Sequence, residues 1–261
     1  MFFPFPDFLF ALRVQQPGEQ ERIAVFPGEC SHFSWLELAL FLGRDFRPEW
    51  MGTKDEDVHR EFQACGSGDA FYHQSRRYLY HLIQYFMEGF KRPAYAFLFE
   101  VLALNAQQTV LDYGCGIGED GLWFMANKIQ VSFADFNNPC SRFLAWRLDH
   151  RLNAHDVSVY NIAVDTIPHH DIVWCMDVLE HLPPAEHLHF LAKLGLLGRC
   201  VIINFVDDKT ADGLVHHTVD VDGLTNWLEA HGPCAWKDFH EKPDGSKVRF
   251  VLYRLEEGET P

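Results

Sequence analysis

The sequence predicts an α/β fold in which a mostly parallel, seven-stranded sheet carries helices on both faces. Three observations lead to this prediction. From about residue 105 onward, short apolar runs alternate with helical patterns, as in parallel sheets covered on both sides. Near the end, CAWKDFH and VRFVLYRL flank the turn signal EKPDGSK, which indicates an antiparallel hairpin. Residues 1–104 lack this alternation, so we expect an N-terminal α+β extension followed by one domain over residues 105–261.

The alternating region contains five candidate strands before the hairpin. Apolar runs place them at residues 109–113, 130–134, 157–160, 171–176 and 199–205. Helical patterns lie between them at residues 121–128, 139–153 and 184–195. The second of these helices carries a series of basic residues, which we expect to form a solvated face rather than a phosphate-binding patch: Arg142, Arg147 and Arg151.

The N-terminal extension predicts two short strands and then helices. DFLFALRVQ and RIAVFPG flank a Pro-Gly turn, and FSWLELALFLG indicates a short buried helix that ends at Gly43. A polar, loop-like stretch follows, with a helical turn expected at residues 55–62. Residues 72–104 are helical in pattern, with a break at Pro93. This region either packs over the main domain or forms a lid over the acceptor pocket.

Composition limits the classes of partner. The formal charge of −15 comes from 37 acidic and 22 basic side chains, which makes nucleic acid and anionic membranes poor default partners. The seven cysteines are dispersed without metal-ligand spacing. The first residues lack the cationic start of a signal peptide, and no run approaches the ~18 apolar residues of a membrane span. We therefore expect a cytoplasmic protein; the oligomeric state is not predicted.

The stretch VLDYGCGIGEDG, residues 110–121, places three glycines between a strand and a helix. Glycines permit positive φ and let a ligand approach the main chain, and ligands of open α/β sheets bind at this edge. Glu119 and Asp120 follow where a dinucleotide-binding loop has its third glycine. A pyrophosphate beside them would cost about 1 to 4 kcal/mol per close pair of charges. The loop therefore favours a ligand without phosphates, preferably a cationic one.

LDYGCGIGEDG resembles the glycine-rich motif of class I S-adenosylmethionine-dependent methyltransferases, which have a Rossmann-like fold. VSFADFNN, DIVWCMDVLEHL and VHHTVDVDGLTNWLEAHG are similar to later segments of that family, in the same order. The resemblance covers about residues 105–255. It implies S-adenosyl-L-methionine as cofactor and methylation of an acceptor, for which a small molecule, modified at oxygen or nitrogen, is our leading expectation.

The resemblance also implies roles for individual residues. Asp135 would accept both ribose hydroxyls, because a carboxylate accepts two hydrogen bonds without needing a donor. Phe136 would lie against the adenine, and Asn161 and Ile162 would follow the third strand near that base (with Asp165 as the alternative register). Outside the resemblance, Tyr72 and Arg77 lie in a helix that we expect to cover the cofactor, where they would either reach the methionine carboxylate or form an ordinary helix surface of mixed polarity. The full cofactor-binding set is Asp112, Gly114, Cys115, Gly116, Gly118, Asp135, Phe136, Asn161, Ile162, Cys175, Met176, Tyr72 and Arg77.

His181 and His217 are the candidate catalytic bases, because each follows a strand that should end at the cofactor crevice and histidine titrates near neutrality. An alternative comes from related methyltransferases in which an ExxEH segment binds a divalent ion. Here that set would be Asp177, Glu180, His181 and His217. Our primary expectation is that no metal is bound.

Two other functions stay open at this point. A nicotinamide-dependent oxidoreductase would use the same loop, although Glu119 and Asp120 disfavour it. A non-catalytic scaffold could retain the loop and bind cofactor without any transfer. An RNA methyltransferase would run against the net charge.

Overall fold

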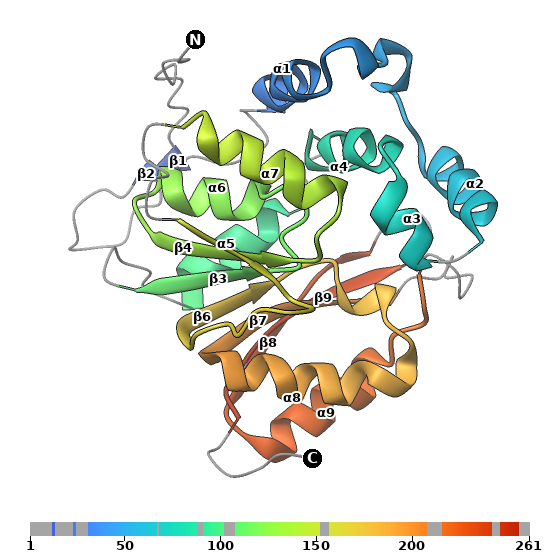
Figure 1. Ribbon diagram of the computed structural model, residues 1–261. Helices are drawn as coiled ribbons and strands as arrows, with labels where there is room; N and C mark the ends of the chain where they lie inside the picture. Colours follow the sequence, from blue (N-terminus) through green and yellow to red (C-terminus); the bar gives the residue numbers. More distant parts are fainter. Residues whose placement is uncertain are drawn as a thin grey trace.

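The computed structural model describes residues 12–13, 23–24, 31–66, 68–87, 91–101, 108–151, 157–207, 216–241 and 246–255. Seven strands form one sheet in the order β5-β4-β3-β6-β7-β9-β8 (Figure 1). Their bounds are β3 Thr109–Tyr113, β4 Gln130–Asp135, β5 Ser158–Asn161, β6 His170–Cys175, β7 Gly198–Asp207, β8 Cys234–Glu241 and β9 Lys247–Tyr253.

The sheet is mixed in the way that the sequence predicts. Strands β3 to β7 pair in parallel, whereas β9 is antiparallel to both β7 and β8. The order reverses beside β3, since β4 lies on one side of it and β6 on the other. That reversal is the switch point where open α/β sheets bind ligands. The α/β fold class, the parallel strands and the C-terminal hairpin are confirmed.

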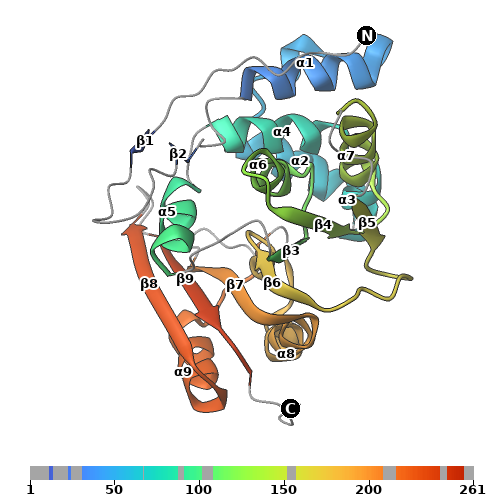
Figure 2. The same cartoon turned by 90° about the vertical axis from the view of Figure 1, so that its left-hand side faces the viewer.

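Helices cover both faces of the sheet (Figures 1 and 2). On one face, α5 (Arg92–Val101), α6 (Glu119–Ala126) and α7 (Pro139–Asp149) enclose a core that includes Phe124 and Trp174. On the other, α8 (His187–Leu197) and α9 (Val221–His231) pack over a second core that includes Leu191 and Val201. Alternate residues of each strand enter opposite cores, as the pleat requires.

The start of α7 follows the capping rules. Asn138 is its N-cap and accepts a hydrogen bond from the Ser141 amide at 2.9 Å, and Pro139 occupies the first turn. The next helical face is buried through Phe143 and Leu144. These local signals explain why this helix could be placed from the sequence.

The N-terminal extension contributes a separate layer of helices. Its bounds are α1 Ser31–Leu42, α2 Asp55–Cys65, α3 Gly68–Gln74 and α4 Arg77–Met87, with 3₁₀ turns at Gly43–Asp45 and Pro48–Trp50. In Figures 1 and 2, α4 lies beside α7, and α1 lies on the side of both helices that faces away from the sheet. The two expected strands pair antiparallel over Leu12–Arg13 and Ile23–Ala24.

Three details of the extension differ from expectation or fall outside the described part. The helical turn expected at residues 55–62 is a longer helix, α2. The helical pattern that starts at residue 72 is broken at Ser75, whose hydroxyl accepts a hydrogen bond from the Tyr78 amide at 3.0 Å, so that α3 and α4 are separate. Residues 102–104 of the expected second helix lie outside the described residues. Within the described residues, no helix has the length and hydropathy needed to cross a membrane.

Candidate functional site

The glycine loop connects β3 to α6 through three left-handed residues. The φ angles of Gly114, Gly116 and Gly118 are 71°, 54° and 80°, a region that only glycine enters without strain. A Cβ on Gly114 would lie 2.4 Å from Val178, and one on Gly118 would lie 2.4 Å from Leu144. A Cβ on Gly116 would meet only Leu82 of α4, at 3.5 Å. The outer two glycines are thus needed for packing as well, while the middle one leaves the backbone accessible.

Asp135 ends β4 and reaches directly to this loop. Its Oδ2 accepts a hydrogen bond from the Gly116 amide at 2.7 Å, and its Oδ1 accepts one from Asn138 Nδ2 at 3.2 Å. Burial raises the pKa of this carboxyl to about 6, although the hydrogen bonds from Gly116, Phe136 and Asn138 act in the opposite direction. The fold therefore brings Asp135, the residue predicted to bind the ribose, into contact with the glycine loop.

The residues predicted for the adenine side lie beside Asp135. Phe136 follows it and is 47% exposed, which leaves an apolar ring face available. Asp135 and Asn161 are register partners in β4 and β5, and the Ile162 amide donates to the Asp135 carbonyl at 3.0 Å. Asp165 binds the Asn161 amide through Oδ2 at 2.7 Å. Both candidate registers of this loop thus lie next to the end of β4.

The end of β6 is held in an unusual backbone conformation. Cys175 and Met176 are buried, and Asp177 follows them with a φ of 55°, which is rare for a residue with a side chain. Asn204 of β7 supports this conformation from one side: it accepts from the Asp177 amide and donates to Asp177 Oδ1, both at 2.7 Å. Local strain of this kind persists where the surroundings over-determine it.

Glu119 does not present a free charge to a ligand. It is buried, accepts a hydrogen bond from Ser34 Oγ at 2.6 Å, and pairs with Arg147 at 2.9 Å. Arg147 is itself buried and also pairs with Glu37 at 2.8 Å. The expectation that Arg147 belongs to a solvated face is therefore wrong, and the same holds for Arg151, which pairs with Glu37 at 2.7 Å; only Arg142 is exposed.

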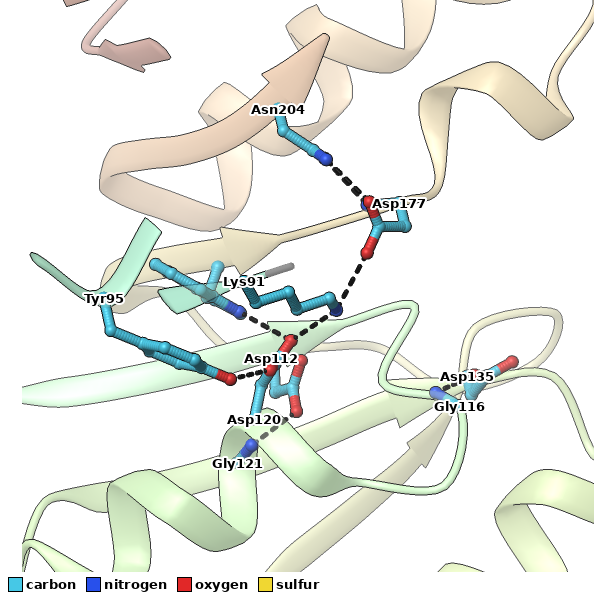
Figure 3. Close-up of polar contacts among 10 residues, drawn as sticks. Lys91, Tyr95, Asp112, Gly116, Asp120, Gly121, Asp135, Asp177 and Asn204 are labelled. Atoms are coloured by element: carbon cyan, nitrogen blue, oxygen red, sulfur yellow. Dashed lines mark hydrogen bonds and ion pairs between the residues drawn. The ribbon is translucent and has the colours of Figure 1, made fainter. Parts of the chain in front are cut away.

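Asp120 is engaged in the same way by a different set of residues (Figure 3). Its carboxylate contacts Lys91 Nζ at 2.9 Å, accepts from Trp174 Nε1 at 3.0 Å, and accepts from the Tyr95 hydroxyl. Lys91 and Tyr95 come from the N-terminal extension. The argument that Glu119 and Asp120 repel a pyrophosphate is corrected by these contacts, because each carboxylate already faces a cation.

Asp112 and Gly121 fix the distance between β3 and α6. Asp112 Oδ2 accepts a hydrogen bond from the Gly121 amide at 2.8 Å, and a Cβ on Gly121 would lie 2.1 Å from a ring carbon of Phe133. Burial, and then the charge of Asp120, raise the pKa of Asp112 well above its usual range. Asp112 therefore supports the loop from beneath.

On the acceptor side, the structure joins Tyr72 to His181. The Tyr72 hydroxyl lies 2.9 Å from His181 Nδ1. The His181 ring centroid is 4.9 Å from that of His216, whereas His217 uses its backbone amide to donate to the Glu180 carbonyl at 2.7 Å. Burial first, and then Glu180, raise the pKa of Tyr72 far above its usual range, so its hydroxyl stays protonated.

Arg77 and the alternative metal set are placed differently from expectation. The Arg77 guanidinium lies 3.5 Å from Asp57 and 3.9 Å from Glu61, both on α2, so this arginine is committed to the extension. Asp177 of the alternative metal set binds Lys91 and Asn204. Among the residues that the structure describes, no three of His, Cys, Asp or Glu are grouped so that they could hold a metal ion.

Sequence reasoning missed four residues that organise the site: Ser34, Lys91, Tyr95 and Asn204. Each contacts a carboxylate that is distant in the chain. The sequence offered one signal. Glu119, Asp120 and Asp177 could be buried only if other residues supplied donors or cations to their carboxylates.

No protein-family model and no curated protein matches this sequence. Among solved structures, magnesium protoporphyrin IX methyltransferase (ChlM) from Synechocystis PCC 6803 with bound SAM has a TM-score of 0.53 at 17% identity, over 84% of this chain and 97% of that one. The N-terminal domain of EvdMO1 with SAH bound has a TM-score of 0.52 at 15% identity, over 79% and 99%. PH0226 from Pyrococcus horikoshii OT3 has a TM-score of 0.53 at 14% identity, over 71% and 95%.

These likenesses establish the fold. The chain shares a Rossmann-like α/β fold with these structures, and its seven-stranded sheet order agrees with that fold. The match to the first of these structures covers 84% of the chain, which is more than residues 105–261 make up. The match therefore includes part of the N-terminal extension.

Proposed function

We propose that the chain is an S-adenosylmethionine-dependent methyltransferase that acts on a small-molecule acceptor at oxygen or nitrogen. The observation that carries the proposal is the Asp135 carboxylate, which lies at the end of β4, is tied to the Gly116 amide at 2.7 Å, and adjoins the exposed Phe136 ring. A carboxylate beside an apolar ring suits a nucleoside, because it accepts from both ribose hydroxyls while the ring packs on the base.

Most of the residues predicted to bind the cofactor lie around Asp135, but Arg77 does not fit this set. Gly116 has no side chain to obstruct the loop and donates its amide to Asp135. Asn161 and Ile162 adjoin Asp135, and Met176 directly follows β6, where we propose that the methionine end lies. The cofactor would supply a methyl group carried on a sulfonium, which needs in-line positioning more than acid–base chemistry. Arg77 drops out of the proposed set because α2 holds it.

His181 is the base that we propose for an acceptor that carries a proton. To take that proton on Nε2, His181 must hold its other proton on Nδ1 and donate it to the Tyr72 oxygen, 2.9 Å away. Tyr72 thus acts as a positioning residue for His181 in this proposal, in place of its expected contact with the cofactor. His217 also lies next to the loop that carries His181, because its backbone amide donates to the Glu180 carbonyl, and it stays the second candidate base.

Calorimetric titration with S-adenosylhomocysteine tests the proposal. We expect the wild-type protein to bind it and the Asp135→Ala variant to bind at least tenfold more weakly, because two charge-assisted hydrogen bonds are lost. Asp149→Ala is the matched control, because Asp149 is exposed at the end of α7, and it should leave the affinity unchanged.

The rival functions give different outcomes in the same experiment. Tight binding of NADH without binding of S-adenosylhomocysteine would replace the proposal with a nicotinamide-dependent oxidoreductase. Binding of S-adenosylmethionine without turnover over a broad panel of acceptors would favour a non-catalytic scaffold.

A further inference from the structure

Lys91 connects three parts of the chain at one point. It directly precedes α5 in the N-terminal extension, and its Nζ lies 2.9 Å from Asp120 at the start of α6 and 3.0 Å from Asp177 after β6 (Figure 3). The side chain is only 13% exposed. A buried ammonium between two carboxylates stays charged, and the attraction of Asp120 and Asp177 indeed raises the pKa of Lys91 above its usual value against the effect of burial.

The two carboxylates belong to the two loops that flank the switch point of the sheet. Asp120 lies two residues after Gly118, the last glycine of the loop. Asp177 lies directly after Met176 and has the left-handed φ of 55°. Asn204 holds one oxygen of Asp177 at 2.7 Å, and Lys91 holds the other. The Asp177 side chain is therefore fixed from two sides, and with it the backbone that leads to Glu180 and His181.

We infer that Lys91 is a positioning residue that fixes the distance between the glycine loop and the loop after β6, and so shapes the part of the site that receives the methionine moiety of the cofactor. This inference rests on the proposed function for the identity of the ligand. Through Lys91, the N-terminal extension becomes a component of the cofactor site, although Lys91 contacts neither the ribose nor the base.

Loss of Lys91 should affect one end of the proposed cofactor site more than the other. Without the ammonium, Asp120 and Asp177 face each other uncompensated in a buried setting, and repulsion drives the two loops apart. Asp135 and Phe136 belong to a different strand end and keep their own hydrogen bonds, such as that from Gly116. Loss of Lys91 therefore weakens binding of a ligand that spans both loops but leaves the nucleoside end intact.

The test compares two probes, S-adenosylhomocysteine and adenosine, by calorimetry on folded protein. We expect Lys91→Met to raise the dissociation constant of S-adenosylhomocysteine at least tenfold while that of adenosine changes less than twofold. Lys91→Arg, which keeps the charge, should restore S-adenosylhomocysteine affinity to within about threefold. Lys247→Met is the control, because Lys247 is exposed on β9, and it should change neither affinity.

The outcomes separate this inference from the proposed function. If the wild type binds no S-adenosylhomocysteine, the proposed function fails first. If the wild type binds it and Lys91→Met binds it equally well, or loses adenosine in the same proportion, the positioning role is overturned.

Should Lys91→Met fail to fold, Asp177→Asn tests the same contact from the other side. This variant keeps an oxygen for Asn204 and loses the ion pair with Lys91. It should weaken the binding of S-adenosylhomocysteine three- to tenfold and leave the affinity for adenosine unchanged. If the affinities for the two probes are both unchanged, or both fall by the same factor, the inference is overturned.

Discussion

Glu119 and Asp120 are neighbours in the chain, yet the two networks around them differ in charge balance. On the Glu119 side, Arg147 and Arg151 compensate Glu119 and Glu37. On the Asp120 side, Lys91 pairs with both Asp120 and Asp177. The first network joins α1 to α7 and also holds the glycine loop, because Arg147 donates to the Ile117 carbonyl at 2.8 Å. The second network adjoins the same loop and reaches the loop after β6 as well.

The difference separates a structural network from one that bears on a ligand. Balanced buried charges need no further partner. The Asp120 side keeps an anionic excess, and its neighbour Asp112 has a raised pKa because of burial and the Asp120 charge. An excess of negative charge beside a glycine loop suits a sulfonium or ammonium group. Under the proposed function, we expect the Asp120 network to bear on a cationic ligand more than the Glu119 network does, because it borders both loops of the proposed site.

The largest expected effect comes from breaking the balanced network. Arg147→Met removes the cation that pairs with the buried Glu119, while Glu37 keeps its ion pair with Arg151. The free energy of unfolding should therefore fall by about 3–5 kcal/mol. Denaturant titration measures this. The exposed Arg142 on the same helix provides the control, since Arg142→Met should change stability by less than about 0.5 kcal/mol.

A smaller effect is expected from removing one hydroxyl from each carboxylate. Ser34→Ala deletes the donor to Glu119, and Tyr95→Phe deletes a donor to Asp120. Each should cost about 1.5–3 kcal/mol of stability, the range for hydrogen bonds to charged groups. The two variants should differ in ligand binding. We expect only Tyr95→Phe to weaken the binding of S-adenosylhomocysteine, because Asp120 can then move relative to Lys91. Equal weakening in both variants would remove the distinction between the networks.

The smallest effect concerns pH and a third carboxyl, Asp135. Its pKa is raised to about 6, chiefly by burial, and the ionised form is the one that accepts two ribose hydroxyls. The dissociation constant of S-adenosylhomocysteine should therefore rise about tenfold per pH unit below about 6, or about 1.4 kcal/mol, and level off above it. Calorimetry from pH 5 to 8 measures this slope, and a slope that survives in Asp135→Asn would assign it to another group.

The same shift has a defined sign for stability. Between the ordinary carboxyl pKa of about 4 and the folded value of about 6, the folded state binds more protons than the unfolded state. The contribution of Asp135 to the stability of the ligand-free protein therefore decreases as pH rises through that interval.

The sheet was accessible from the sequence because its signals are local. The run Val110–Tyr113 is apolar apart from Asp112 and is followed by a glycine, and EKPDGSK predicts the turn between β8 and β9. Such patterns need no partner to be recognised. The break between α3 and α4 at Ser75 was missed because a serine is compatible with helix and loop alike.

The partners of the carboxylates were not accessible in this way. Arg147 is on a helix whose arginine series suggested solvent, and its partner Glu37 is 110 positions away in the chain. Lys91 lies two residues before Pro93 in a helical pattern, and nothing in the neighbouring sequence indicates that Asp120 and Asp177 converge on it. Periodicity shows which face is apolar, but it does not show which charge meets which.

The sequence by itself determined the α/β fold, the glycine loop and the position of Asp135, because helix and strand periods and glycine conformations are properties of short segments. Tertiary structure alone decided that Glu119 and Asp120 serve as anchors for the N-terminal extension and that Tyr72 meets His181. The physical reason is that charges and hydroxyls pair through space, between elements that only the folded sheet brings together.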